Sequence, residues 1–192
     1  MSDIAPVCGV LAALAGVANT IPYVRDIARG TTRPHRGAWL IWSVLAIVAY
    51  GSQRADGARW SLLMIAVQAV LTTLVFVLAI RRGEGGLSAN DTIMIGLAAA
   101  GVVGWMVTDE PLLATASVVA ADLLAAVMMA PKTYRDPGSE TLATYALASL
   151  AGALAVGAVG APDLSLLLYP VYFCAVNAAI AILIRQRRAA LA

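Results

Sequence analysis

The stretches NTIPYVRD, at residues 19–26, and MAPKTYRD, at residues 129–136, decide the fold of this chain. Each lies near the end of an apolar stretch, contains a proline, ends in an Arg-Asp pair and leads into a polar turn before a new apolar stretch. Proline inside a helix removes a backbone hydrogen bond and bends the helix. The same pattern in two corresponding places predicts a duplicated helical bundle with a substrate site between the copies.

The rest of the chain has the composition of a membrane protein. Of its 192 residues, 61% are hydrophobic and 12% are charged, whereas soluble domains have about 45–50% and about 25%. A transmembrane helix needs about 20 mainly apolar residues. We expect an all-α membrane protein with seven spans, at residues 4–28, 37–53, 59–81, 90–108, 112–134, 140–160 and 164–185.

The charged residues predict how these spans are oriented, although the net charge is only +2. Basic residues follow spans one, three, five and seven, whereas acidic residues mark two of the opposite loops. By the positive-inside rule, we expect a multi-pass protein of the cell (inner) membrane with its N-terminus outside and its C-terminus cytoplasmic. The first stretch has no basic region before it, so we expect it to remain as a span rather than to be a cleaved signal peptide.

The two proline stretches divide the chain into three spans, one span and three spans. The expected boundaries are 1–86 for the first three-helix bundle, 87–110 for a linker helix and 111–192 for the second bundle. One intervening span makes both bundles cross the membrane in the same direction, which is the arrangement of parallel-repeat transporters.

This layout resembles the SWEET and PQ-loop superfamily (MtN3-saliva-like), with the chain as a divergent bacterial member. The similarity is carried by residues 22–32, by Ala49-Tyr50-Gly51 at the end of the second span, and by residues 170–177 in the seventh. Tyr23 and Lys132 stand where that family has glutamine after its prolines. The resemblance implies a transporter that moves a small polar solute (a sugar, amino acid or amine) by alternating access between the bundles.

Asp122 is the carboxylate that lies deepest in an apolar stretch. An ionisable group at the bilayer centre costs about 2.5–3.5 kcal/mol on insertion scales and usually faces a bundle interior or a wet cavity. We interpret Asp122 as a proton-coupling group or as the counter-charge of a cationic substrate. The alternative is a hydrogen-bonded residue that fixes helix packing.

Several other residues are candidates for substrate binding. Pro170, Phe173 and Asn177 share one helical face, and the amide of Asn177 has both donors and acceptors. Interhelical hydrogen bonding is the alternative role of Asn177, and the family resemblance favours binding. The other candidates come from spans two and three, where packing or interface roles compete with binding, and they are Trp42, Tyr50, Gln68 and Thr73. Trp39 is expected to be an interface anchor.

Pro22 and Pro131 are predicted hinges. One membrane proline alone would mean little, because neighbouring helices tolerate it. Two prolines at matched places near one side of the membrane favour a pair of kinks that move an inner gate; kinks that only shape the bundle are the alternative.

Other function classes lack their chemistry in this sequence. Cys8, Cys174 and the single His35 have no partners at metal-binding spacing, and we expect the cysteines to pack and His35 to lie in a solvated loop. There is no catalytic set or phosphate-binding loop, so we expect no cofactor, no nucleic-acid partner and no enzyme. A retinal Schiff base needs a mid-membrane lysine in the last span, and the single lysine, Lys132, lies at the end of the fifth, so a retinal protein is excluded.

The partners expected are a small polar solute and the lipid bilayer, with oligomerisation allowed but not required. The alternative function is a non-transporting seven-helix membrane subunit or receptor.

Overall fold

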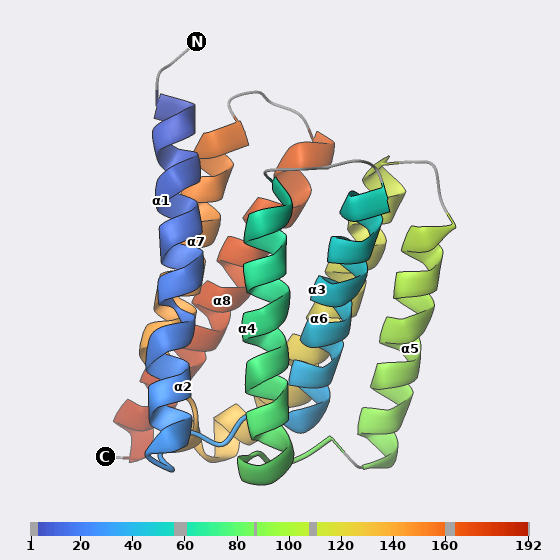
Figure 1. Cartoon of the computed structure of the whole chain (residues 1–192). Helices are drawn as coiled ribbons and strands as arrows, with labels where there is room; N and C mark the ends of the chain where they lie inside the picture. Colours follow the sequence, from blue (N-terminus) through green and yellow to red (C-terminus); the bar gives the residue numbers. More distant parts are fainter. Residues whose placement is uncertain (1–3, 56–60, 87, 108–110, 160–163, 192) are drawn as a thin grey trace.

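The computed structural model describes residues 4–55, 61–86, 88–107, 111–159 and 164–191, and within them the chain is all-helical. Nearly parallel and antiparallel helices form one bundle, with the N-terminus and C-terminus at opposite ends (Figure 1). The elements are α1 (Ile4–Ala18), α2 (Thr20–Ala28), α3 (Arg36–Ala55), α4 (Ser61–Arg82), α5 (Ala89–Met106), α6 (Pro111–Arg135), the short 3-10 helix η1 (Pro137–Ser139), α7 (Leu142–Val159) and α8 (Leu164–Leu191).

Four helical stretches of the described residues are long and apolar enough to cross a bilayer, namely Ile4–Ala28, Thr115–Arg135, Leu142–Val159 and Leu167–Leu191. Their length and composition indicate a multi-pass membrane protein. The apolar parts of α3 and α5 are shorter, at Arg36–Val48 and Ala89–Gly104. The expected all-helical membrane class is therefore confirmed, and the complete set of seven spans stays a prediction.

The two prolines affect their helices differently. The first apolar stretch is interrupted at Asn19, three residues before Pro22, and continues as α2. Pro22 has no amide hydrogen for the carbonyl of Ala18, which explains a break at this point. The neighbouring carbonyl of Asn19 instead accepts a hydrogen bond of 2.9 Å from the hydroxyl of Thr144 on α7. Pro131 lies inside α6, which continues through it as one helix.

The helices other than α5 pack into one continuous bundle, and α5 lies on its outside. In the N-terminal part, α4 lies between α3 on one side and α1–α2 on the other. In the C-terminal part, α8 lies between α6 and α7 in the same way. The two parts meet through the pairs α1·α7 and α3·α6, while α5 packs on the outside against α6 and α3. We call these two parts the triplets: α1–α2, α3 and α4 in the first, and α6, α7 and α8 in the second. In both, the third helix is the central one.

The packing of α7 against α8 depends on Gly152. A Cβ atom at this position would lie 2.6 Å from the backbone nitrogen of Cys174, which is closer than non-bonded atoms approach. The absence of a side chain therefore lets the two backbones come together, as small residues do in membrane bundles. Ser149 adds a 3.1 Å hydrogen bond from its hydroxyl to the carbonyl of Cys174.

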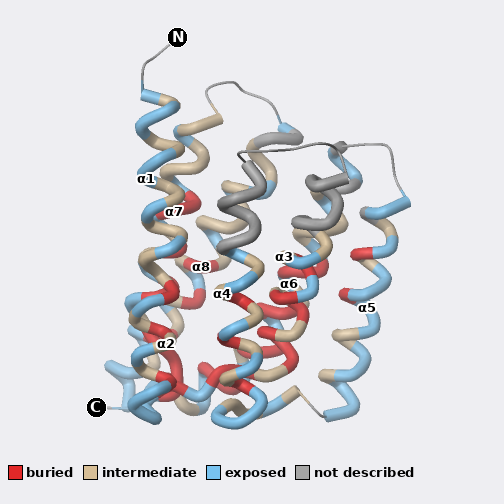
Figure 2. Tube along the Cα trace, in the orientation of Figure 1, coloured by how far each residue is buried: buried red, intermediate tan, exposed pale blue. Residues whose placement is uncertain are grey.

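The two ends of the bundle differ in burial. The α2–α3, α4–α5 and α6–α7 connections and the C-terminus all lie at one end, the bottom of Figure 1. We call it the basic end, because Arg33, Arg82, Arg135 and Arg188 belong to these segments. Among the described residues, the buried ones are concentrated in the half of the bundle next to this end (Figure 2). Helix α1, which lies toward the opposite end (Figure 1), has no buried residue.

Candidate functional site

A cavity of about 440 Å³ lies between the helices of the two triplets. Its volume falls within the range of about 300–1,000 Å³ that small-molecule sites occupy. Helices α3, α4, α6, α7 and α8 all contribute side chains to it, and Asn19 at the α1–α2 break completes the lining. The lining residues are Asn19, Trp39, Trp42, Leu45, Ala46, Gln68, Thr72, Thr115, Val118, Asp122, Ala126, Thr144, Tyr145, Ala148, Tyr169, Phe173, Val176, Asn177 and Ile180.

Asp122 stands in the wall of this cavity and is 8% exposed. The hydroxyl of Tyr172 on α8 donates a 2.7 Å hydrogen bond to its Oδ2 atom. The side chain of Trp42, on α3, lines the same cavity. The hydrogen bond to Tyr172 connects Asp122 and its helix, α6, to α8.

Four other predicted residues line the same cavity. Phe173 and Asn177 lie one turn apart on α8, and the Asn177 amide nitrogen donates a 2.8 Å hydrogen bond to the Phe173 carbonyl. Trp42 faces the cavity from α3, where its ring meets Trp39 edge to face at 5.0 Å. Gln68, on α4, is exposed and marks a place where the cavity reaches the molecular surface.

Two predicted residues are not placed in the cavity. Thr73 is half-buried outside the lining, and its neighbour Thr72 lines the cavity instead. Successive residues of a helix point about 100° apart because a turn has 3.6 residues, so a shift of one position changes the face. The side chain of Tyr50 lies outside the part of the chain whose side chains are described.

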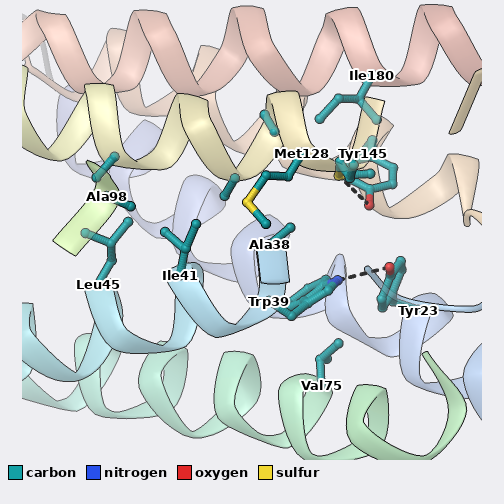
Figure 3. Close-up of a cluster of buried hydrophobic side chains, with 14 of the residues drawn as sticks. Tyr23, Ala38, Trp39, Ile41, Leu45, Val75, Ala98, Met128, Tyr145 and Ile180 are labelled. Atoms are coloured by element: carbon teal, nitrogen blue, oxygen red, sulfur yellow. Dashed lines mark hydrogen bonds between the residues drawn. The ribbon is translucent and has the colours of Figure 1, made fainter. Parts of the chain in front are cut away.

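At the basic end, the cavity is bounded by a buried polar network around Glu140. Glu140 is 1% exposed and precedes α7. Its Oε2 accepts hydrogen bonds of 2.9 Å from the hydroxyls of both Tyr23 and Tyr145, and its Oε1 lies 2.5 Å from the Lys132 ammonium. The indole of Trp39 donates to the Tyr23 hydroxyl at 3.1 Å (Figure 3). The residues that follow the two prolines, Tyr23 and Lys132, thus meet at one carboxylate.

Trp39 and Tyr145 belong to both the network and the cavity lining. Their rings therefore form the cavity floor, and the Glu140 cluster lies beneath it. We call the group Tyr23, Trp39, Lys132, Glu140 and Tyr145 the inner network.

Further polar contacts hold the two triplets together below the inner network. The hydroxyls of Thr32 and Thr141 lie 2.6 Å apart, and Thr141 also donates to Asp26 at 3.0 Å. Arg33 pairs with Asp136. Each Asp that ends a proline stretch is therefore bound by a residue of the other triplet.

Arginines at the ends of α4 and α8 play equivalent parts within each triplet. Arg82 donates to the carbonyls of Ile27 and Ala28 at the end of α2. Arg187 donates to the carbonyl of Tyr134 at the end of α6. Helix C-termini leave carbonyls without helical partners, and basic side chains satisfy them.

No family model, curated protein or solved structure matches this chain.

Two expectations about single residues are wrong. His35 is 5% exposed rather than solvated, because it packs beside Gly85 and Gly37 and its Nε2 lies 3.8 Å from Asp91. Burial lowers the pKa of this imidazole from its ordinary value of 6.5. Trp39 is 8% exposed and donates a hydrogen bond to Tyr23 of the inner network, so it is a core residue rather than an interface anchor.

The sequence pattern did not reveal Glu140. It stands at the predicted start of a span, beside a turn, where a carboxylate is usually solvated. The available signal was the placement of Tyr23 and Lys132 after matched prolines, because a buried lysine needs an anionic partner.

Proposed function

We propose that this chain is a SWEET-like transporter that moves a small polar solute across the membrane by alternating access. The carrying observation is the cavity, which is lined by both triplets and has amide, hydroxyl, carboxyl and aromatic groups together. Parallel-repeat transporters place their substrate near the midplane, at the interface between repeats.

The inner network supports a gated pathway. It crosses between the triplets at the floor of the cavity, and it joins the residues that follow Pro22 and Pro131. Movement about these prolines would separate Tyr23 and Lys132 from Glu140 and open the floor. The positions of the two prolines beside the network favour the hinge role over a purely architectural one.

The basic end is proposed to face the cytoplasm and the N-terminus the outside. The segments at that end contain Arg33, Arg82, Arg135 and Arg188, and cytoplasmic loops carry an excess of Lys and Arg. The arrangement then corresponds to a transporter closed on its cytoplasmic side.

A ligand screen followed by flux measurement tests this proposal. The purified full chain is warmed in the presence of sugars, amino acids, amines and vitamins, because a ligand that binds the folded state raises its unfolding temperature. Every stabilising compound is then tested, in labelled form, for uptake into proteoliposomes. We expect saturable uptake that Asn177→Ala weakens and that Tyr134→Phe, on the exposed face of α6, leaves unchanged. A compound that binds without being transported would favour a non-transporting subunit or receptor instead.

A further inference from the structure

The cavity has a one-sided charge. Among the described residues that line it, Asp122 is the one with a formal charge, and the others are neutral polar, aromatic or aliphatic. Lys132, in the inner network beneath the floor, already binds Glu140 at 2.5 Å. A ligand in the cavity therefore meets a carboxylate that no basic residue among the described lining balances.

The hydrogen bond that Asp122 accepts is suited to its ionised form. The Tyr172 hydroxyl donates to its Oδ2 at 2.7 Å. An ionised carboxyl group is an acceptor only, with about four lone-pair positions, so this donor leaves acceptor capacity for a ligand. A buried charge is costly unless it is paired, and a cationic ligand supplies the missing partner.

Aromatic rings line the cavity together with the carboxylate. Trp39 and Trp42 form an edge-to-face pair on α3, with ring centres 5.0 Å apart. Tyr169 and Phe173 form a stacked pair on α8, with centres 5.8 Å apart. Both α3 and α8 pack against α6, the helix that holds Asp122. Aromatic faces attract ammonium groups, most strongly where water is excluded.

We infer that the cavity binds a small organic cation, an amine or quaternary ammonium compound, with its charge paired to Asp122 and its apolar part between the aromatic pairs. This inference rests on the proposed function only in taking the cavity as the substrate site. The amides of Asn177 and Gln68 are placed to bind polar groups elsewhere on such a molecule.

The test compares cations with neutral molecules of the same shape. Choline is compared with 3,3-dimethylbutan-1-ol, and benzylamine with benzyl alcohol, by tryptophan fluorescence and thermal unfolding of the full chain in nanodiscs. We expect at least one cation to bind about tenfold or more tightly than its neutral counterpart, as charge pairing and cation–π attraction require. Asp122→Asn removes this preference, and Asp136→Asn, which deletes an exposed carboxylate outside the cavity, keeps it.

Any other binding result contradicts the inference. Equal binding of a cation and its neutral isostere, or no binding of either cation, overturns it. This comparison uses the wild-type chain, so its result does not depend on whether a variant folds. Unchanged cation binding by Asp122→Asn with lost proton-driven uptake would assign Asp122 to proton coupling alone. Flux is measured separately in proteoliposomes. Transport of sugars or neutral amino acids without cation binding would contradict this inference and leave the proposed function standing. Asp122-dependent cation binding without flux would support this inference and contradict the proposed transport function.

Discussion

The basic end and the cavity half of this bundle use polar residues in opposite ways. At the basic end, Glu140 has a partner for each oxygen: Lys132 on Oε1, and Tyr23 and Tyr145 on Oε2. In the cavity, Asp122 accepts a hydrogen bond from Tyr172, and no described residue of the lining is cationic. A satisfied network makes a region rigid and specific, whereas an unbalanced charge prepares a region for a ligand.

Glu140→Ala should have the largest effect. It leaves the buried Lys132 ammonium without its anionic partner, and breaking a buried ion pair costs about 3–5 kcal/mol. We expect a large fall in the unfolding temperature of the purified protein.

Glu140→Ala combined with Lys132→Met is the control, since no unpaired charge then remains and much of the loss should be recovered. A single variant as stable as the parent would mean that the inner network does not hold the basic end together.

Gly152→Ala should be the next most damaging change. The added Cβ would fall 2.6 Å from the backbone nitrogen of Cys174, and overpacking of this kind costs about 1–3 kcal/mol. Gly16→Ala on α1 is the matched control, because a Cβ there meets nothing within 4 Å. Thermal unfolding should therefore separate the two variants. Equal stabilities would contradict the close contact between α7 and α8.

Pro22→Ala and Pro131→Ala should act on transport more than on folding. Each substitution restores a backbone donor, and we expect stability to change by less than about 1 kcal/mol. Uptake should slow several-fold in both, and more in Pro22→Ala, because the helix is interrupted beside Pro22 and continuous through Pro131. Wild-type rates in both variants would make the kinks purely architectural.

The smallest expected effect is a pH dependence from His35. Burial lowers the pKa of this imidazole below the ordinary 6.5, so the unfolded chain binds a proton at a higher pH than the folded one. The contribution of neutral His35 is therefore complete above about pH 6.5 and is lost as the pH falls toward its folded pKa. Unfolding temperature should drop between pH 7.5 and 5, and less in His35→Gln. A drop of the same size in the variant would assign it to other groups.

The sequence predicted the helical membrane class and several residues of the cavity. Apolar length identified the helices, and the cost of burying a carboxylate singled out Asp122, which the structure places in the cavity wall. The pairing of Phe173 with Asn177 followed from helical spacing.

The inner network could not be predicted from apolar length or helical spacing. Its members come from four helices and from the loop before α7, and hydropathy does not report which loop residues fold back between helices. The sequence also did not fix which face of a helix lines the cavity: Thr73 was predicted to do so, and its neighbour Thr72 lines it instead.

The most direct test of alternating access is the labelling of a cavity cysteine from both sides of the membrane. Ala46, which lines the cavity, is replaced by cysteine in a chain that also carries Cys8→Ala and Cys174→Ala. A membrane-impermeant thiol reagent is applied to right-side-out and to inverted vesicles. We expect labelling from both sides, and faster labelling from the basic end when Glu140→Gln weakens the inner network. Labelling from one side only, with or without Glu140→Gln, would contradict alternating access.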